Sequence, residues 1–182
     1  MKKYLVIVLF VIATQLNAQD KQTKFDVKFG VGISLLGTGD MTTINFENET
    51  NYKISQYFST SFTLNYGRSN SGVYETSSYI QGNLNIFISP FKNNRKNDFR
   101  IGTGFSIMNI SDSYYFLQEC GVGIEQTSPY HFDKRNSSGF NIIIEDTYSI
   151  NEKYLIGLKL FTQPYFNGDL NSGVLLKFGL KI

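Results

Sequence analysis

The residues best suited to catalysis stand close together in the sequence, as Ser128, His131 and Asp133. A serine, a histidine and an aspartate are the side chains of a hydrolase triad, in which the histidine takes the proton of the serine and the aspartate orients the histidine. His131 is the only histidine of the chain. A general base must come within about 3 Å of its nucleophile, and no local pattern holds these side chains at that range. The sequence therefore predicts a solvated loop here rather than a catalytic site.

Few other residues carry reactivity. Cys120 is the single cysteine, so an intrachain disulfide and a multi-cysteine metal site are excluded, and no base stands beside it to activate the thiol. The Gly-Val-Gly runs at 30–32 and 121–123 could open a dinucleotide fingerprint, but Leu35 and Gln126 stand where its third glycine belongs. We expect no catalytic residue, no cofactor and no metal site.

The charge balance argues against a nucleic-acid partner. The chain has 182 residues, with 17 Lys and Arg against 15 Asp and Glu. Residues 1–18 contain two lysines and no acid, so the rest of the chain has 15 charges of each sign. A neutral chain lacks the basic footprint that binds phosphates, and no nucleic-acid binding is expected.

The N-terminal segment has the layout of a secretory signal peptide. Two lysines precede an apolar run from Tyr4 to Ala13, and cleavage is expected after Ala18. The run is shorter than the roughly 20 residues of a membrane-spanning helix, although a retained N-terminal anchor is the alternative. We therefore expect a signal peptide at 1–18, a short linker at 19–24 and one domain at 25–182.

The rest of the chain alternates between apolar and polar residues. Phe25, Val27 and Phe29 begin a run in which every second residue is apolar and the residues between are small or charged. This period of two indicates β-strands with two unlike faces. Asn48 and Thr50 interrupt the apolar face of the second segment. The pattern predicts eight strands, each long enough to cross a bilayer at a tilt, at 25–35, 43–54, 58–67, 79–88, 99–107, 140–150, 154–163 and 173–182.

The predicted connections alternate between short and long. Short ones are expected at 55–57, 90–98 and 151–153, and longer polar ones at 37–42, 68–78, 110–137 and 163–171. Short turns on one side and long loops on the other are typical of outer-membrane barrels, whose short turns face the periplasm.

The composition of the polar face indicates that the apolar face points outward, towards lipid. A soluble barrel would carry many Lys and Glu on its polar surface, whereas this face is rich in Gly, Ser, Asn and Thr. Its four acidic and six basic residues could pair inside a narrow barrel. We expect a lumen charge network made of Asp26, Lys28, Glu47, Glu49, Lys53, Arg100, Glu145, Lys159, Lys177 and Lys181.

Aromatic residues add a second indication of a membrane. Transmembrane barrels place Tyr and Phe at the level of the lipid headgroups. On the short-turn side we expect a periplasmic aromatic girdle of Phe25, Tyr52, Phe58, Phe99, Tyr148 and Tyr154. Because hydrocarbon cannot satisfy a free strand edge, the first strand must pair with the last. A closed barrel of eight strands is narrow, and side chains fill its interior.

Together, the signal-peptide layout, the eight alternating segments, the unequal connections and the terminal segment 173–182 resemble the small OmpA/OmpX-like outer-membrane barrel family. The resemblance covers residues 25–182 and rests on architecture rather than on a short motif. It implies an all-β, eight-stranded, antiparallel up-and-down transmembrane barrel in a Gram-negative outer membrane. It also implies insertion by the barrel-assembly machinery, which recognises a C-terminal aromatic residue in many members; here the chain ends in Leu180, Lys181 and Ile182, with Phe178 nearby.

We therefore expect a non-enzymatic outer-membrane barrel with a side-chain-filled lumen, contacting membrane lipid. It would act in envelope integrity or bind a surface ligand or protein through its long extracellular loops. The segment 110–137 is the longest of these loops, and Phe116, Val122 and Ile124 alternate weakly within it. The alternatives are an outer-membrane lipid-acting enzyme, a narrow solute channel, and a soluble secreted ligand-binding barrel.

Overall fold

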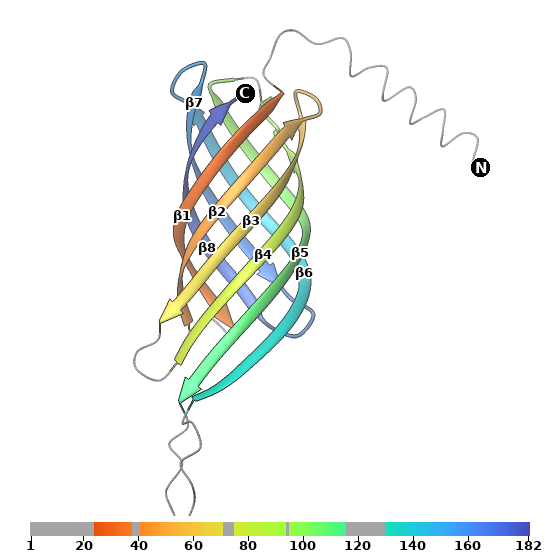
Figure 1. Ribbon diagram of the computed structural model, residues 1–182. Helices are drawn as coiled ribbons and strands as arrows, with labels where there is room; N and C mark the ends of the chain where they lie inside the picture. The colour runs from red at the N-terminus through yellow and green to blue at the C-terminus, as the bar shows by residue number, and fades with distance from the viewer. Residues whose placement is uncertain (1–23, 38–40, 71–74, 94, 116–129) are drawn as a thin grey trace, which may run out of the picture.

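A computed structural model describes residues 24–37, 41–70, 75–93, 95–115 and 130–182. The chain forms one closed antiparallel barrel in which each strand pairs with its neighbours in the sequence (Figure 1). This confirms the predicted eight-stranded, antiparallel up-and-down β-barrel. The strands are β1 (Phe25–Gly37), β2 (Met41–Lys53), β3 (Phe58–Asn70), β4 (Glu75–Ile88), β5 (Asn97–Tyr115), β6 (Tyr130–Ser149), β7 (Tyr154–Pro164) and β8 (Leu170–Lys181).

Pairing of β1 with β8 closes the barrel, from Asp26 opposite Lys181 to Gly37 opposite Leu170. The strands are strongly staggered. Following paired residues around all eight strands from Phe25 leads back to β1 at Leu35, a displacement of ten positions. Eight strands with this stagger enclose an interior that side chains can fill.

The barrel is apolar outside and polar inside. Along β7 the residues alternate between buried and exposed, with the apolar Leu158 and Leu160 exposed and Lys159 buried between them. Phe29 is 51% exposed, Ile86 59% and Leu158 49%, so these side chains do not form a core. Such a continuous apolar surface is typical of a face that meets lipid, which favours the membrane barrel over the soluble-barrel alternative. In the described ranges, no helix is long and apolar enough to cross a bilayer.

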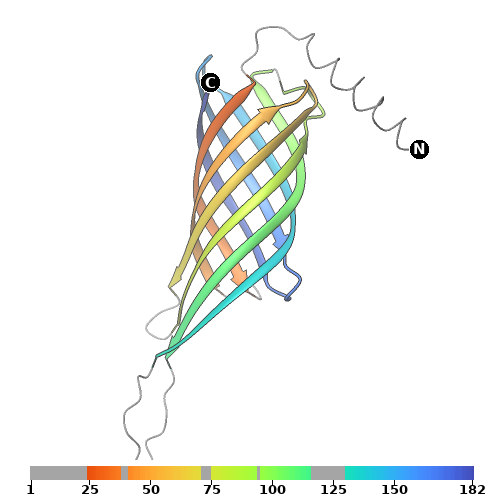
Figure 2. The same ribbon diagram turned by 45° about the vertical axis from the view of Figure 1, so that its right-hand side comes forward.

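The strands are longer than the sequence pattern predicted. β5 has 19 residues and β6 has 20, and together they form a hairpin that extends well beyond the rest of the barrel (Figure 2). The expected long connections shrink accordingly, and the one expected at 37–42 leaves only residues 38–40 outside strands. Alternation in hydrophobicity marks only the part of a strand that meets lipid, whereas ladder hydrogen bonds continue into water. Pro164, within the connection expected at 163–171, is the last residue of β7.

The opposite end of the barrel, here called the short-turn end, has compact connections. In the turn after β2, the Ser55 hydroxyl accepts hydrogen bonds from the backbone amides of Tyr57 and Phe58. In the turn after β6, the Asn151 side-chain oxygen accepts from Lys153 and Tyr154 in the same way. Serine and asparagine close turns by such local bonds, so these connections are short as predicted.

Candidate functional site

The interior of the short-turn half contains a group of paired charges, here called the charge cluster. Every strand except β3 and β4 contributes to it. Its members, Asp26, Lys28, Glu47, Glu49, Arg100, Glu145, Lys159 and Lys177, are each at most 4% exposed. They are eight of the ten residues predicted for the lumen, and they comprise four carboxylates and four cations.

Arg100 joins the carboxylates of two opposite strands. Its Nη2 lies 2.6 Å from an oxygen of Glu49 on β2 and 2.8 Å from an oxygen of Glu145 on β6. Its Nη1 donates to the side-chain oxygen of Asn51 at 2.8 Å. The guanidinium carbon lies 3.9 Å from the centre of the Phe87 ring, so the flat side of the group is covered as well.

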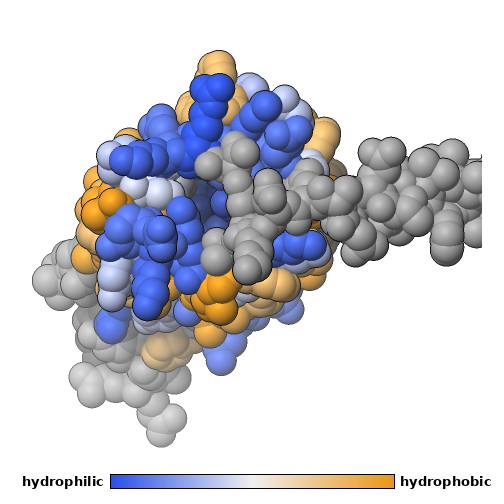
Figure 3. Space-filling model, turned by 90° about the horizontal axis from the view of Figure 1, so that it is seen from above, coloured by the Kyte–Doolittle hydropathy of each residue, from blue (hydrophilic) through white to orange (hydrophobic). Residues whose placement is uncertain are grey.

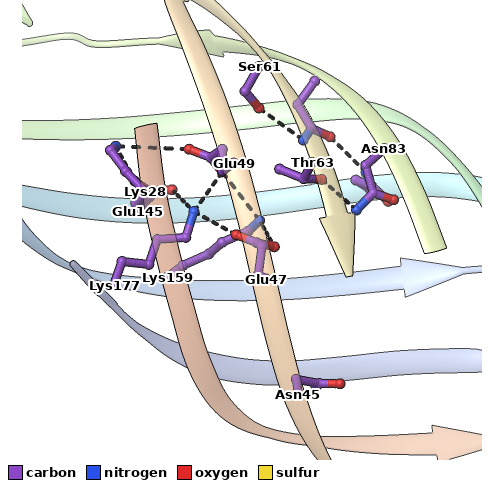
Figure 4. Close-up of polar contacts among 12 residues, drawn as sticks. Lys28, Asn45, Glu47, Glu49, Ser61, Thr63, Asn83, Glu145, Lys159 and Lys177 are labelled. Atoms are coloured by element: carbon purple, nitrogen blue, oxygen red, sulfur yellow. Dashed lines mark hydrogen bonds and ion pairs between the residues drawn. The ribbon is translucent and has the colours of Figure 1, made fainter. Parts of the chain in front are cut away.

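Two lysines approach the same carboxylates from β7 and β8 (Figure 4). Lys177 Nζ is 2.6 Å from Glu49 and 3.1 Å from Glu145. Lys159 Nζ donates to Glu47 at 2.6 Å. The three glutamates of the cluster therefore each have more than one cationic partner, and both ammonium groups bridge strands that are distant in sequence.

Lys28 of β1 completes the cluster. Its Nζ lies 2.7 Å from Glu145 and 3.8 Å from Asp26. Withdrawing an ion from water costs several kcal/mol, and only close opposite charges with additional hydrogen bonds offset that cost. The equal number of charges and the short distances meet this condition.

Lys53 and Lys181, the other two predicted members, do not join the cluster. Both are partly exposed at the short-turn end, and Lys53 Nζ donates to the backbone oxygen of Asn93 at 3.0 Å. Viewed onto this end, the rim is mostly hydrophilic and hollowed at its centre, and hydrophobic residues appear on the flanks (Figure 3). The two lysines are therefore positioned near water rather than in the ion-paired interior.

Uncharged polar side chains fill the lumen beside the charge cluster. Asn83 donates to Thr63 at 2.8 Å, and Asn85 donates to Ser61 at 3.2 Å (Figure 4). Asn141 on β6 then donates to Asn85 on β4 at 2.7 Å, past the intervening strand β5. These bonds tie β3, β4 and β6 together inside the barrel.

The half of the lumen nearer the hairpin is closed by apolar and tyrosine side chains, here called the apolar cap. It consists of Leu36, Tyr79, Met108, Ile110 and Tyr165, none more than 5% exposed. The Tyr79 hydroxyl donates to Asn45 and accepts from Asn171, while the Tyr165 hydroxyl lies 3.0 Å from Ser106.

Sequence reasoning did not identify the apolar cap, although a signal for part of it was present. Tyr79 and Phe87 occupy the inward phase of the alternation, where small or polar residues predominate, and Ile143 breaks the pattern of its strand. Phe87 and Ile143 belong to a second buried apolar group, with Phe161 and Leu175. Large apolar residues in the inward phase indicate a filled interior rather than an aqueous one.

Two of the three residues considered for a hydrolase triad do not lie in the predicted loop. His131 and Asp133 lie in β6 rather than in a loop, because the β5–β6 ladder continues to Tyr130. Ser128 and Cys120 lie outside the described residues, as do the predicted signal peptide at 1–18 and residues 19–23 of the predicted linker. Within the described part of the chain, no group of three or more His, Cys, Asp or Glu residues could hold a metal ion.

The predicted girdle residues lie around the short-turn end of the outer surface. Phe25, Phe58, Tyr148 and Tyr154 are each about half exposed, from 47% to 54%. The rings of Phe25 and Tyr52 are 4.8 Å apart. Phe91, which the prediction did not include, lies 6.4 Å from the ring of Phe99, the sixth predicted member.

The protruding hairpin is anchored by one arginine. Arg135 of β6 pairs with Asp112 of β5, and its Nε lies 3.2 Å from Asp169 in the β7–β8 connection. Partial burial opposes the charge, but the two carboxylates outweigh it and raise the pKa of Arg135, which keeps the guanidinium charged. These two ion pairs hold the base of the hairpin against the β7–β8 connection.

One edge of the hairpin is open. β5 pairs with β4 as far as Tyr114 opposite Glu75. β6 pairs with β7 only from Ile142 onwards, apart from a bridge at Gly139. The backbone oxygen of Ser138 accepts a hydrogen bond from the backbone amide of Phe166. Every second residue of β6, counted from Ser138, therefore directs its backbone N–H and C=O groups to this side.

Comparisons with known proteins identify the fold. No protein-family model and no curated protein sequence matches the chain. Among solved structures it is similar to the attachment invasion locus protein Ail of Yersinia pestis, with a TM-score of 0.61 and 10% identity over 87% of this chain and 98% of that one. It is also similar to Neisserial surface protein A (TM-score 0.58, 10% identity, 90% and 100% covered) and to OprG of Pseudomonas aeruginosa (TM-score 0.58, 10% identity, 88% and 97% covered). The chain therefore has the fold of small outer-membrane β-barrels.

Proposed function

We propose that this protein is a non-conducting, non-enzymatic barrel of the outer membrane that supports envelope integrity and binds a surface partner through the β5–β6 hairpin. It would reach the membrane through the signal peptide at 1–18 and the barrel-assembly machinery. The observation that carries the proposal is the filled lumen, because a channel requires a continuous aqueous path.

The lumen is blocked by two different means in series. In the short-turn half, an entering ion would have to separate carboxylates and cations that lie within about 3 Å of each other, such as Glu49 and Lys177. In the other half it would meet the apolar cap, whose members offer few polar groups to a hydrated ion. Either layer alone opposes conduction, and the two together favour a structural body over a narrow solute channel.

Conductance in planar lipid bilayers tests the closed lumen. Folded protein, recognised by a change in gel mobility only after boiling, should leave the bilayer current at its background level. Unitary current steps that depend on the folded protein would contradict the proposal and favour the channel. Recovery of the protein in the outer-membrane fraction of cells tests its location separately.

The open edge of the hairpin supports the surface-binding part of the proposal. Between Phe132 and Ser138, β6 has no neighbouring strand on its outer side in the described ranges. Unpaired backbone groups bind extended segments of other proteins by adding a strand. Of the similar structures, Ail has also been solved with the heparin analogue sucrose octasulfate, so a barrel of this fold can present a binding surface.

A proline at Lys134 tests this edge. Lys134 is exposed and lies four residues before Ser138, so the backbone groups of both residues point to the same side of β6. The amide of Lys134 therefore faces the open side and not β5. Extended peptides selected from a displayed library against the wild type should lose binding to Lys134→Pro and keep binding to Lys134→Thr, which retains the amide. Equal binding by both variants would exclude strand addition at this edge.

A lipid-acting enzyme is the competing function. In the Ser-His-Asp form considered above, His131 would be its base, because the chain has no second histidine. The lipid composition of membranes should be unchanged in cells that carry His131→Ala. A loss of a lipid modification in that variant would contradict the non-enzymatic assignment.

A further inference from the structure

Two polar side chains interrupt the lipid-facing surface of β2. Asn48 and Thr50 are exposed on the outer face, and they make no hydrogen bond within the described residues. The residues opposite Asn48 are Phe29 on β1 and Leu64 on β3, about half exposed at 51% and 52%. The amide thus lies among apolar side chains, within the surface that lipid covers.

Four other outward polar side chains of the same surface find their hydrogen-bond partners within the barrel itself. The Thr60 hydroxyl donates to the backbone oxygen of Asn85 at 2.8 Å, and the Thr103 hydroxyl donates to that of Asn141 at 2.9 Å. The hydroxyls of Thr162 and Ser172 lie 2.7 Å apart. The side-chain amide of Asn48 has no such partner among the described residues. Its two N–H donors and its oxygen acceptor therefore face the surroundings of the barrel.

Acyl chains offer no hydrogen-bonding group, so an unpaired amide at this depth is unfavourable and polar residues in membranes join proteins together. We propose that β2 forms the interface with a second copy of this chain, related by a two-fold axis along the membrane normal. In this arrangement the Asn48 amides of the two copies hydrogen-bond to each other, and Thr50 adds a hydroxyl beside them. The inference rests on the proposed position of the barrel in a bilayer.

A second copy fits the requirement better than another partner. The amide group is self-complementary, since the donors of one match the acceptor of the other. A two-fold axis along the membrane normal also places identical residues at identical depths, here between Phe46 and Tyr52 on β2.

Asp146 offers a contrasting arrangement. It is another exposed polar residue of the outer surface, on β6, opposite the girdle residue Phe99. In the strand order, β6 lies four strands from β2, on the opposite wall. A contact between Asn48 of one copy and Asp146 of the next would therefore be head-to-tail and would build an open chain rather than a dimer.

Cysteine crosslinking in lipid vesicles distinguishes these arrangements. In a Cys120→Ser background, Asn48→Cys should form a disulfide-linked dimer on oxidation, and Asp146→Cys should not. Crosslinking confined to a mixture of the two variants would overturn the two-fold dimer in favour of an open chain. Inserted protein that stays monomeric in all cases would overturn the self-association itself.

Substitution of the amide provides the second readout. Asn48→Leu should fold and shift on gels as the wild type does, but self-association in vesicles, measured by energy transfer between labelled copies, should weaken about tenfold. Ile144→Ala, an exposed apolar residue of β6 on the opposite wall, serves as the control and should associate as the wild type does. Unchanged association of Asn48→Leu would contradict the proposal, whereas failure of the wild type to insert would contradict the barrel's membrane location instead.

Discussion

The two halves of the lumen are closed by opposite kinds of interaction. The charge cluster joins six strands through ion pairs, and its partners lie far apart in sequence, as Lys28 and Glu145 do. The apolar cap closes the other half by packing Leu36, Met108 and Ile110 against two tyrosines. Both are buried, but they respond differently to the loss of one member. Removing one charge leaves another uncompensated, whereas removing an apolar side chain leaves a cavity.

The largest effect is expected in the charge cluster. Glu49→Gln removes the carboxylate shared by Arg100 and Lys177 and leaves both cations short of a partner. The free energy of unfolding in lipid vesicles, measured with urea, should fall by about 3–5 kcal/mol. Glu152→Gln, the same change at an exposed turn residue, should leave it unaltered. If Glu49→Gln lowers the free energy of unfolding by less than a substitution in the apolar cap does, the charge cluster is not the more sensitive half.

A cavity in the apolar cap should cost less. Met108 is fully buried, so Met108→Ala should lower the free energy of unfolding by about 2–4 kcal/mol. The adjacent Ile107 points outward and is 58% exposed, so lipid can fill the space that Ile107→Ala leaves. If the two alanine variants lose equal stability, the distinction between a packed interior and a lipid-facing exterior is wrong at this strand.

The tyrosine hydroxyls of the apolar cap test whether hydrogen bonds contribute to its stability beside apolar packing. Tyr79→Phe keeps the ring in place but removes the hydroxyl that contacts Asn45 and Asn171. The remaining buried amides lose one partner each, and the expected loss is about 1–2 kcal/mol, measured by the same unfolding assay. An unchanged free energy of unfolding would mean that packing alone holds the apolar cap together.

The smallest effect is expected outside the membrane. Arg135 is an ion-pair residue like Arg100, but its side chain is 37% exposed whereas that of Arg100 is 2% exposed. Arg135→Ala should therefore lower the free energy of unfolding by less than about 1 kcal/mol. Proteolysis of the hairpin should become faster than in Lys134→Ala, because the contact with Asp169 is lost. A large loss of global stability would show that the hairpin supports the barrel.

The sequence allowed the barrel to be predicted because lipid on one side and a closed interior on the other impose a period of two on every strand. The charged residues of the inward phase could be assigned to the lumen for the same reason. Which charges meet could not be predicted, because contacts such as Lys28 with Glu145 depend on the stagger that closes the barrel. The stagger is a property of all eight ladders together, and no local segment specifies it.

The protruding part of the hairpin was missed for a related reason. Where β5 and β6 leave the membrane, both faces meet water, so residues such as Asp133 and Lys134 follow no alternation. Hydrogen bonds between the two strands hold that part together, and backbone pairing leaves little trace in the choice of side chains. The same limit led to the prediction of a loop around His131.

One face of every strand is expected to meet acyl chains while the other is sealed inside. Tryptophan fluorescence tests it directly, because the chain contains no tryptophan. Leu160 is 48% exposed on the outer face of β7, and the next residue, Phe161, is 6% exposed and faces the lumen. In vesicles whose acyl chains carry bromine, the emission of Leu160→Trp should be strongly quenched and that of Phe161→Trp should not. Equal quenching of the two, or quenching of Phe161→Trp alone, would contradict the account.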